Sequence, residues 1–374
     1  MRIGIPAETR AGETRVAATP ETVKKMVGIG HVVMVQPGAG NGASIPDTDF
    51  QTAGATLSSA AELYTQSEII LKVQAPTEAE LAQLSPGCVL IGLLSPYQAE
   101  RVAAYATRGI TAFAMEKLPR ISRAQAMDVL SSQANIAGYK AVIVGANHYK
   151  RFMPMLMTAA GTVKAARVVV LGVGVAGLQA IATAKRLGAV IEASDVRPAV
   201  KEQVESLGAK FIDVPYENDE ERNAALGVGG YARAMPASWM ERQKIEVAKR
   251  VALADIIITT ALIPGRAAPV LVTEEMVKSM KPGSVIVDMA IEAGGNCPLS
   301  ESGKTVVKHG VTLVGEENLP ALMSSDASAL YSRNLLNFLN LLCDPKNGGT
   351  ININRTDEII AGALLCIDGE TVSK

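Results

Sequence analysis

The fold is decided by the stretch RVVVLGVGVAGLQAIATAKRLGAVIEASD, residues 167–195. A run of β-branched residues leads into a glycine-rich turn at Gly172, Gly174 and Gly177, and an amphipathic segment then leads to an apolar run ending at Asp195. This order is typical of a βαβ unit that binds a dinucleotide. The first glycine allows a tight turn, the second lets the backbone approach a pyrophosphate, and the third lets the helix pack on the strand. The helix N-terminus would offer free N–H groups to the phosphates.

Asp195 is expected to bind the ribose hydroxyls of the dinucleotide. It follows Gly177 by eighteen residues, at the end of the second predicted strand, where such a carboxylate usually stands. Its charge would repel the 2′-phosphate of NADP, so NAD(H) is the expected cofactor. Arg197 could instead receive that phosphate, pair with Asp195 or stack on the adenine. Without a ligand, the glycines would simply mark a tight turn between strand and helix.

Two further strand ends belong to the same region. The predicted strands Asp255–Thr260 and Ser284–Met289 are both followed by small residues, at the carboxyl ends of strands where nucleotides bind in such sheets. Either end could also be an ordinary turn. The expected cofactor-binding residues are Gly172, Val173, Gly174, Val175, Ala176, Gly177, Asp195, Val196, Arg197, Thr260, Ala261 and Leu262.

The first third of the chain also alternates apolar runs with amphipathic ones. Its predicted strands are Arg2–Ile5, His31–Val35, Glu68–Val73, Val89–Leu94 and Ile110–Met115. The later part adds Arg167–Leu171, Val190–Asp195, Lys210–Val214, Asp255–Thr260, Ser284–Met289 and Val311–Gly315. Strands that alternate with helices predict parallel sheets. The predicted fold class is therefore α/β, with two Rossmann-like, doubly wound parallel-sheet domains joined by long helices, and a cleft between them.

Two long helical segments set the predicted domain boundaries. Ile121–Ala146 has apolar residues at helical spacing and should lead from the first domain into the second, as one or two helices. Ser324–Leu342 is amphipathic and should cross back. The first domain is then discontinuous and flavodoxin-like, residues 1–131 plus 322–374, and the NAD(H)-binding Rossmann domain spans 132–321. The tail Thr350–Val372 predicts small peripheral strands, and Asn218–Ala234 predicts a mobile surface loop.

Composition excludes several functional classes. The chain has 374 residues, 48% hydrophobic and 20% charged, with a formal net charge of −1, so neither nucleic acid nor an anionic membrane surface is an expected partner. No apolar run approaches the ~18–20 residues that span a bilayer, and the N-terminus reads as a strand rather than a signal peptide. No metal or disulfide is expected, and a reducing cytoplasm fits, because four cysteines are scattered without ligand spacing: Cys88, Cys297, Cys343 and Cys366.

A polar segment stands between the two predicted domains. In Arg120–Gln133 the density of polar residues is unusual for a segment otherwise patterned as a buried helix. Gln125, Asp128 and Ser132 fall at i, i+3 and i+7, on one face of a helix. That face could donate and accept hydrogen bonds with a carboxamide. A solvated helix face or an interface network is the alternative.

Four stretches carry a resemblance to a known family. They are RISRAQAMDVLSSQANIAGY (120–139), VVVLGVGVAGLQAIATAKRLGAV (168–190), TTALIPG (259–265) and KPGSVIVDMAIEAGGNCPLS (281–300). Together they resemble the NAD(H)-binding component of the proton-translocating nicotinamide nucleotide transhydrogenases, within the alanine dehydrogenase/transhydrogenase family. The likeness extends from the opening RIGIPAETRAGETRVAATPE to NLLNFL at 334–339.

The resemblance implies direct hydride transfer between NADH, bound here, and NADP⁺ held on a partner component. A membrane component would couple this transfer to proton translocation, so the enzyme would be active only with its partner subunits. Gln125 would hold the nicotinamide side, with Arg120, Asp128 and Ser131 as the surrounding hydrogen-bond set, and Tyr231 would belong to a loop that closes over the nucleotide. The chain would then be cytoplasmic and peripheral on the inner face of the plasma membrane through its partners. Its long apolar helices favour a homodimer.

Alanine dehydrogenase, which shares this layout, is the first alternative. Arg15 and Lys72 resemble its substrate-binding Arg and Lys. Oxidation of an amino acid also needs a proton-handling group, and that family uses a histidine in the strand after the Lys. The corresponding region here, residues 89–95, reads VLIGLLS without histidine. A different base could substitute, but the simpler interpretation is that Arg15 and Lys72 are charge partners within the first domain.

A non-catalytic NAD-sensing module is the second alternative. The glycine-rich turn and Asp195 would serve it equally well. The polar segment Arg120–Ser132 discriminates between the two, because a sensor needs no group that acts on the nicotinamide ring.

Overall fold

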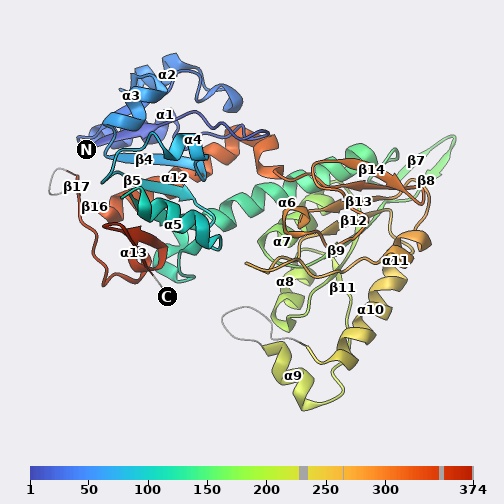
Figure 1. The fold of residues 1–374 in the computed structure, drawn as a ribbon. Coiled ribbons are helices and arrows are strands. Elements are labelled where there is room, and N and C mark those ends of the chain that lie inside the picture. Colours follow the sequence, from blue (N-terminus) through green and yellow to red (C-terminus); the bar gives the residue numbers. More distant parts are fainter. Residues whose placement is uncertain (227–234, 264, 345–348, 373–374) are drawn as a thin grey trace. The chain divides into compact units, whose positions relative to one another are not determined.

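The computed structural model describes residues 1–226, 235–263, 265–344 and 349–372 (Figure 1). Contacts between residues divide the chain into two compact units. Unit 1 combines Met1–Gln133 with Pro320–Lys374, and unit 2 is Ala134–Leu319. Helix α6 (Val129–His148) runs through the boundary. Each unit is built on a mainly parallel sheet, so the α/β class with two Rossmann-like sheets is confirmed.

The sheet of unit 1 has the strand order β19-β18-β6-β5-β4-β1-β2-β3. Its strands are β1 (Arg2–Ile5), β2 (Val32–Val35), β3 (Thr56–Leu57), β4 (Ile69–Gln74), β5 (Val89–Leu93), β6 (Thr111–Ala114), β18 (Leu364–Ile367) and β19 (Glu370–Thr371). The first six strands are parallel, whereas β18 pairs with β6 in the antiparallel direction and β19 pairs with β18 in the same way.

The strand order of unit 1 differs from the flavodoxin-like order expected for it. A flavodoxin-like sheet has the order 2-1-3-4-5. Here β2 and β3 both lie on one side of β1, and β4, β5 and β6 lie on the other, which is the dinucleotide-binding order. The alternation of strands and helices in the sequence does not show to which side each crossover turns. The strand order therefore had to come from the structure.

Helices cover both faces of this sheet. They are α1 (Pro20–Gly28), α2 (Asp47–Thr52), α3 (Ala60–Gln66), α4 (Glu78–Leu81), α5 (Ala99–Thr107), α12 (Ser324–Leu342) and α13 (Glu358–Ala363). Because alternate strand residues point to opposite faces, Ile69 and Leu71 of β4 join the core beneath α1 and α12, while Ile70 joins the core beneath α3 and α5.

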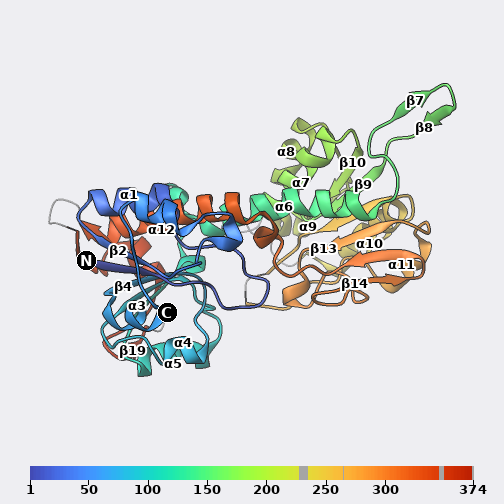
Figure 2. The same ribbon diagram turned by 90° about the horizontal axis from the view of Figure 1, so that it is seen from above.

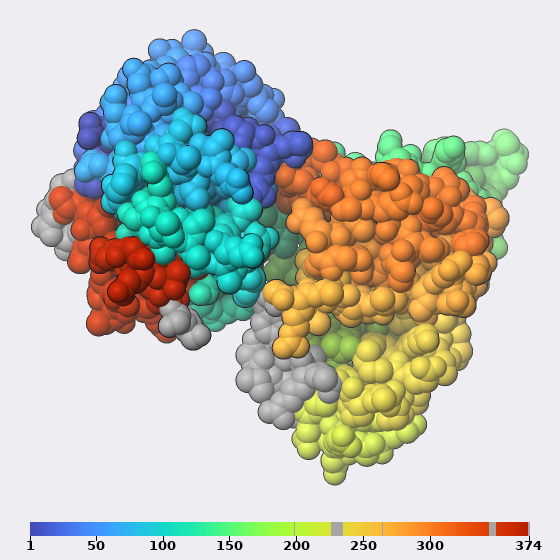
Figure 3. Space-filling view, in the orientation of Figure 1, coloured from blue at the N-terminus to red at the C-terminus, as the bar shows by residue number. Residues whose placement is uncertain are grey.

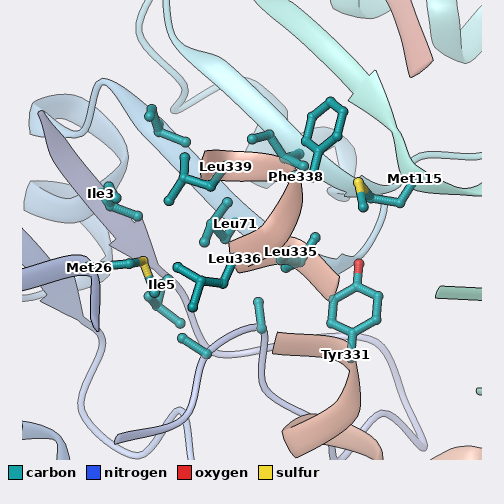
Figure 4. Packing of buried hydrophobic residues seen from close by; sticks show 14 of the residues in the cluster. Ile3, Ile5, Met26, Leu71, Met115, Tyr331, Leu335, Leu336, Phe338 and Leu339 are labelled. Atoms are coloured by element: carbon teal, nitrogen blue, oxygen red, sulfur yellow. The ribbon is translucent and has the colours of Figure 1, made fainter. Parts of the chain in front are cut away.

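Helix α12 brings the C-terminal region of the chain back to unit 1. Its apolar face is buried on the sheet, where Tyr331, Leu335 and Phe338 are each 0% exposed (Figure 4). The ring of Phe338 meets that of Phe113 edge-on, with 5.4 Å between centroids. In Figure 3 the C-terminal residues, in red, adjoin the teal segment before residue 120 within this unit. Burial of this stripe fixes the whole helix against strands from the first third of the chain.

The sheet of unit 2 has the order β11-β10-β9-β12-β13-β15-β14. Its strands are β9 (Arg167–Leu171), β10 (Val190–Ser194), β11 (Lys210–Phe211), β12 (Ile256–Thr259), β13 (Val285–Asp288), β14 (Thr305–Lys308) and β15 (Val311–Val314). All pair in parallel except β14, which is antiparallel to β15. The order again reverses beside the first strand, β9, which is the point where such sheets bind nucleotides.

Helices lie on both faces of this second sheet (Figure 2), and a separate hydrophobic core fills the space beneath them on each face. Val168 and Val170 pack with α6 and α7 (Val175–Arg186), whereas Val169 and Leu171 pack with α10 (Ala237–Val251) and α11 (Glu274–Ser279). A strand buried on both faces reads as a continuous apolar run. This explains why β9 was visible in the sequence with its bounds correct.

Several local predictions were wrong or incomplete. Within the expected loop Asn218–Ala234, residues Asp219–Leu226 form helix α9; its acidic first turn suits the positive end of the helix dipole, and Asn218 accepts a hydrogen bond from the backbone N–H of Glu221. Helix α7 begins at Val175, directly after Gly174 and so within the glycine-rich motif. The hairpin β7 (Leu156–Thr158) and β8 (Gly161–Val163), strand β14 and helix α13 were not predicted.

Three further findings concern the described residues as a whole. No helix among them is long and apolar enough to cross a bilayer, and no group of three or more potential metal ligands gathers within them. All four cysteines are free and buried. Burial raises the pKa of the Cys88 thiol to about 12, so this thiol is not poised to react as a thiolate.

Candidate nucleotide site

The glycine-rich turn connects β9 to α7 in unit 2. Gly172 has φ +95°, a left-handed conformation that favours glycine. A Cβ at Gly177 would collide with the carbonyl oxygen of Gly172, so helix and strand approach each other as closely as two backbones can. Gly174, the N-cap of α7, faces open space, and a Cβ there would meet no atom within 4 Å. The turn is therefore tightly packed at Gly172 and Gly177 and open at Gly174. The open side lies at a helix N-terminus, which is suited to bind an anion.

Asp195 closes one side of this turn. Its carboxylate accepts hydrogen bonds from the backbone N–H of Val173 (2.7 Å) and from the guanidinium of Arg197, at 2.9 Å to each oxygen. Arg197 also donates to the Val173 carbonyl (3.1 Å). Of the three roles considered for Arg197, the structure shows the pairing with Asp195. Its positive charge is therefore largely compensated.

Thr260 supports the turn from the neighbouring strand. Its hydroxyl donates to the Gly172 carbonyl (2.8 Å), and a Cβ at Gly172 would lie 2.7 Å from the same hydroxyl oxygen. Thr260 follows β12, the next strand of the sheet. The structure thus brings Thr260 together with the glycines, as the sequence predicted, while Leu262 beyond it is exposed.

Asn296, which the sequence reasoning missed, holds the segment that follows Thr260. Its fully buried amide accepts from the Ala261 N–H (3.1 Å) and donates to the carbonyls of Ala261 (2.9 Å) and Pro269 (2.7 Å). The backbone N–H of Asn296 donates to Asp288 (3.0 Å), a fully buried carboxylate that also accepts from the Thr259 hydroxyl. A polar pair within the apolar stretch VIVDMAIEAGGN was the available signal, because such groups are retained inside a protein only when fully hydrogen-bonded.

The polar segment of unit 1 does not lie on one helix, as the predicted shared face of Gln125, Asp128 and Ser132 required. Residues Ser122–Met127 form a 3₁₀-helix, η3, and the chain then extends at Asp128 before α6 begins. Asp128 accepts from the backbone N–H (2.9 Å) and the hydroxyl (2.5 Å) of Ser131, and thereby caps the N-terminus of α6. The predicted i, i+3, i+7 face therefore does not exist, because the helix is interrupted at Asp128.

The predicted site residues of this segment differ in their exposure and in their hydrogen bonds. Gln125 is exposed, and its amide makes no hydrogen bond with any residue that the structure describes. Arg120 is also exposed. Asp128 and Ser131 bond to each other, as described above. Tyr231 lies outside the described residues.

Arg15 and Lys72 in unit 1 are held by carboxylates of the same unit. Arg15 forms a forked ion pair with Glu13 (2.6 Å), and Lys72 lies 2.9 Å from Glu80 and 3.4 Å from Glu8. Burial would raise the pKa of Glu13, but the hydrogen bonds and charge of Arg15 outweigh it and bring that pKa to about 2. The interpretation of Arg15 and Lys72 as charge partners within the first domain is confirmed.

One carboxyl group of unit 1 could act as a different base. Glu116 accepts from the backbone N–H of Ser95 (2.8 Å), at the end of the segment that lacks histidine. Its other oxygen is buried and has no partner among the described residues. Burial raises the pKa of Glu116 to about 7. Arg15 and Lys72 of the same unit are paired with carboxylates, however, so neither offers a free positive charge to a carboxylate substrate.

Comparison with known proteins places this geometry in a family. Residues 4–137 match the family described as Alanine dehydrogenase/PNT, N-terminal domain, and residues 141–374 match Alanine dehydrogenase/PNT, C-terminal domain. The chain is 55% identical over 379 aligned positions to an NAD(P) transhydrogenase subunit alpha chain of Rhodospirillum rubrum, covering 100% of this chain and 98% of that protein.

Two further comparisons cover both branches of the family. A solved transhydrogenase structure from Sinorhizobium meliloti has a TM-score of 0.90 and 46% identity, with 100% of each chain covered. Alanine dehydrogenase of Mycobacterium tuberculosis is 33% identical over 86% of this chain and 82% of its own length. These matches confirm the resemblance drawn from the sequence motifs. The chain belongs to the alanine dehydrogenase/PNT family, and its relatives at 55% and 46% identity are transhydrogenases.

Proposed function

We propose that this chain is the NAD(H)-binding subunit of a proton-translocating transhydrogenase. Hydride would pass directly between NADH at the Gly172–Gly177 turn and NADP⁺ on a partner component. The observation that carries the proposal is the turn itself, which is packed behind at Gly172 and Gly177 and open at Gly174. The 55% identity to a transhydrogenase subunit supports the choice of reaction.

The residues around the turn fit NAD(H). The N-terminus of α7 would hold the pyrophosphate, since its first backbone N–H groups have no acceptor within the helix and Gly174 before them faces open space. Each oxygen of Asp195 already accepts two hydrogen bonds, three of the four from Arg197 and one from Val173. A ribose diol would therefore donate to Asp195 in place of part of its pairing with Arg197. A 2′-phosphate would meet a carboxylate there, and Arg197 is already paired with that carboxylate. NAD(H) is therefore favoured over NADP(H) at this turn.

Hydride transfer between two nicotinamide rings needs no general acid or base from the protein. The reduced nicotinamide supplies the hydride, and the acceptor ring takes it up without a proton. The chain would hold the nicotinamide ring in the orientation that transfer requires, and such positioning accounts for a large part of the rate acceleration in reactions of this kind. Gln125, with its exposed and unengaged amide, would orient the carboxamide of the nicotinamide. Arg120, Asp128 and Ser131 would complete the surrounding hydrogen-bond set, and Tyr231 would close over the nucleotide.

The partners are proposed from the family. A partner component would bind NADP(H), and a membrane component would carry the protons. The chain would work only together with them, peripheral on the inner face of the plasma membrane. The R. rubrum relative is named as one portion of a subunit alpha, which supports an enzyme divided among several chains.

A homodimer is the proposed state of this subunit. The segment that leads into hairpin β7–β8 exposes large apolar side chains, with Phe152 57%, Met155 58% and Met157 72% exposed. Methionine and phenylalanine are enriched at protein interfaces. Exposed apolar residues grouped in this way mark an association surface more often than a solvated loop. A second copy of the chain is the proposed occupant.

The first prediction concerns the empty space beside Gly174. Gly174→Ala should leave the fold intact, because the added methyl meets no protein atom and the backbone there, at φ −83°, suits alanine. NADH affinity should fall at least about tenfold, or ~1.4 kcal/mol, because the methyl occupies the place of the pyrophosphate. Calorimetric titration with NADH and thermal unfolding would measure the two effects. Gly28→Ala, at an equally open glycine of α1, is the matched control. Unchanged NADH affinity in Gly174→Ala would place the nucleotide elsewhere.

Reconstitution tests the reaction. The chain mixed with a purified NADP(H)-binding component should reduce the acetylpyridine analogue of NAD⁺ with NADPH, and neither protein alone should do so. Gln125→Ala should lower the rate of hydride transfer by about ten- to hundredfold, as a misplaced ring would, with NADH affinity little changed. Transfer at the full rate by Gln125→Ala would refute its role.

Two outcomes of this assay would favour the alternatives. Binding of NADH without transfer in any mixture would favour a sensor. Oxidation of alanine with NAD⁺ by the isolated chain would favour an alanine dehydrogenase, and would point to Glu116 as the substitute base.

The exposed hairpin gives a prediction for assembly. Met157→Lys should shift the sedimentation equilibrium from dimer toward monomer, because a charge would be buried at the interface. Val307→Lys, at a side chain that is 66% exposed on strand β14, should leave the equilibrium unchanged. If both variants sediment like the unmodified chain, the hairpin is not the interface.

A further inference from the structure

One carbonyl group ties the η3 segment of unit 1 to helix α12. The carbonyl oxygen of Ala126 accepts hydrogen bonds from the side-chain amides of Asn334 (2.8 Å) and Asn337 (3.0 Å). Both asparagines lie on α12, three residues apart and thus on one face of the helix. A carbonyl oxygen has two lone pairs, so the two amides together satisfy it fully.

Asn334 also joins η3 to the beginning of α6. Its side-chain oxygen accepts from the Ser132 hydroxyl (2.7 Å), while its nitrogen donates to Ala126. The side chain is 8% exposed. Asn334 therefore bridges the interruption at Asp128, with one end of its amide on each side. Because the Ala126 carbonyl can only accept, it fixes which end of the amide is nitrogen.

The far end of the segment has a second attachment. Arg123 forms a forked ion pair with Asp357, with distances of 2.6 and 2.8 Å, and Asp357 is the N-cap of α13. This pair is largely exposed on the arginine side, so its contribution is modest. The buried amide of Asn334 is the stronger constraint on the segment.

Gln125 immediately precedes the clamped carbonyl. Its own side chain has no partner among the described residues, so only the backbone of Ala124–Ala126 determines where its amide can reach. We propose that Asn334 and Asn337 are positioning residues, which fix this backbone so that Gln125 presents its amide in one place. The inference rests on the role of Gln125 in the proposed function.

The position of α12 explains why these amides are rigid. On another face, Tyr331, Leu335 and Phe338 are fully buried in the core of unit 1 (Figure 4). The helix cannot rotate without exposing them. A clamp on a packed helix gives the precise support that a functional side chain needs. It also gives a reason, beyond packing, for the C-terminal region of the chain to return to unit 1.

The variants chosen for the test should fold. Ala126 is exposed, so water can solvate its carbonyl when an amide is removed. Asn337→Ala removes one donor. Asn334→Asp keeps an oxygen for Ser132 but replaces the donor to Ala126. Asn340→Ala, at an exposed position of the same helix, is the matched control.

The test uses the full chain, alone and with the NADP(H)-binding component. Asn337→Ala and Asn334→Asp should slow single-turnover hydride transfer at least tenfold, with the NADH dissociation constant within twofold of the unmodified value. Asn340→Ala should do neither. When Asn337→Ala or Asn334→Asp is combined with Gln125→Ala, the transfer rate should fall little below that of Gln125→Ala alone. The effects of residues that act through one another do not add. The proposal would be overturned if Asn337→Ala and Asn334→Asp transfer hydride at the full rate. It would also be overturned if their rate losses add to that of Gln125→Ala.

A second readout does not depend on transfer. The fluorescence of bound NADH reports the surroundings of the reduced nicotinamide, and Gln125→Ala should change it. Asn337→Ala should produce the same change, and Asn337→Gln should partly restore the original emission. If Gln125→Ala changes the emission but Asn337→Ala leaves it unaltered, the clamp does not position Gln125. Failure of the proposed function itself would appear differently, as absence of transfer by the unmodified chain.

Discussion

The close approach of two backbones in unit 2, that of Gly177 to the Gly172 carbonyl, is the constraint on which the nucleotide site depends. Because no side chain fits there, α7 starts directly against the end of β9. Its N-terminal N–H groups and the open side of Gly174 then share one small region. Thr260, Asp195 and Asn296 act around this contact, each by hydrogen bonds to backbone groups of the turn or of the segment beside it.

The two units use similar sheets for different purposes. Both have the order that reverses beside the first strand. In unit 2 that reversal lies beside an open glycine, whereas in unit 1 the conspicuous cations Arg15 and Lys72 are occupied by Glu13, Glu8 and Glu80. The role that we propose for unit 1 rests instead on its connecting segment, where two asparagines donate to the Ala126 carbonyl and the neighbouring Gln125 is exposed.

The turn, the α/β class and the bounds of β9 and α12 could be predicted because each depends on local pattern: glycine spacing, continuous apolar runs or a helical stripe. The features that were missed depend on contacts distant in sequence. Asp128 interrupts the predicted helix by capping α6, and Asn296 and Asn334 act through backbone groups 35 and 208 residues away. An asparagine that binds such a group looks like any other polar residue in the sequence. Strand order in unit 1 was missed for the same reason.

The proposed binding of NAD(H) at the Gly172–Gly177 turn, with discrimination against NADP(H), can be measured directly. Trp239, the only tryptophan of the chain, is buried in unit 2 and stacks on Tyr216, so its emission gives a direct signal for titration of the isolated chain. We expect saturable quenching by NADH, and an affinity for NADPH at least about a hundredfold weaker, or ~2.7 kcal/mol, because the 2′-phosphate would face Asp195. Equal affinity for both nucleotides, or tighter binding of NADPH, would contradict it.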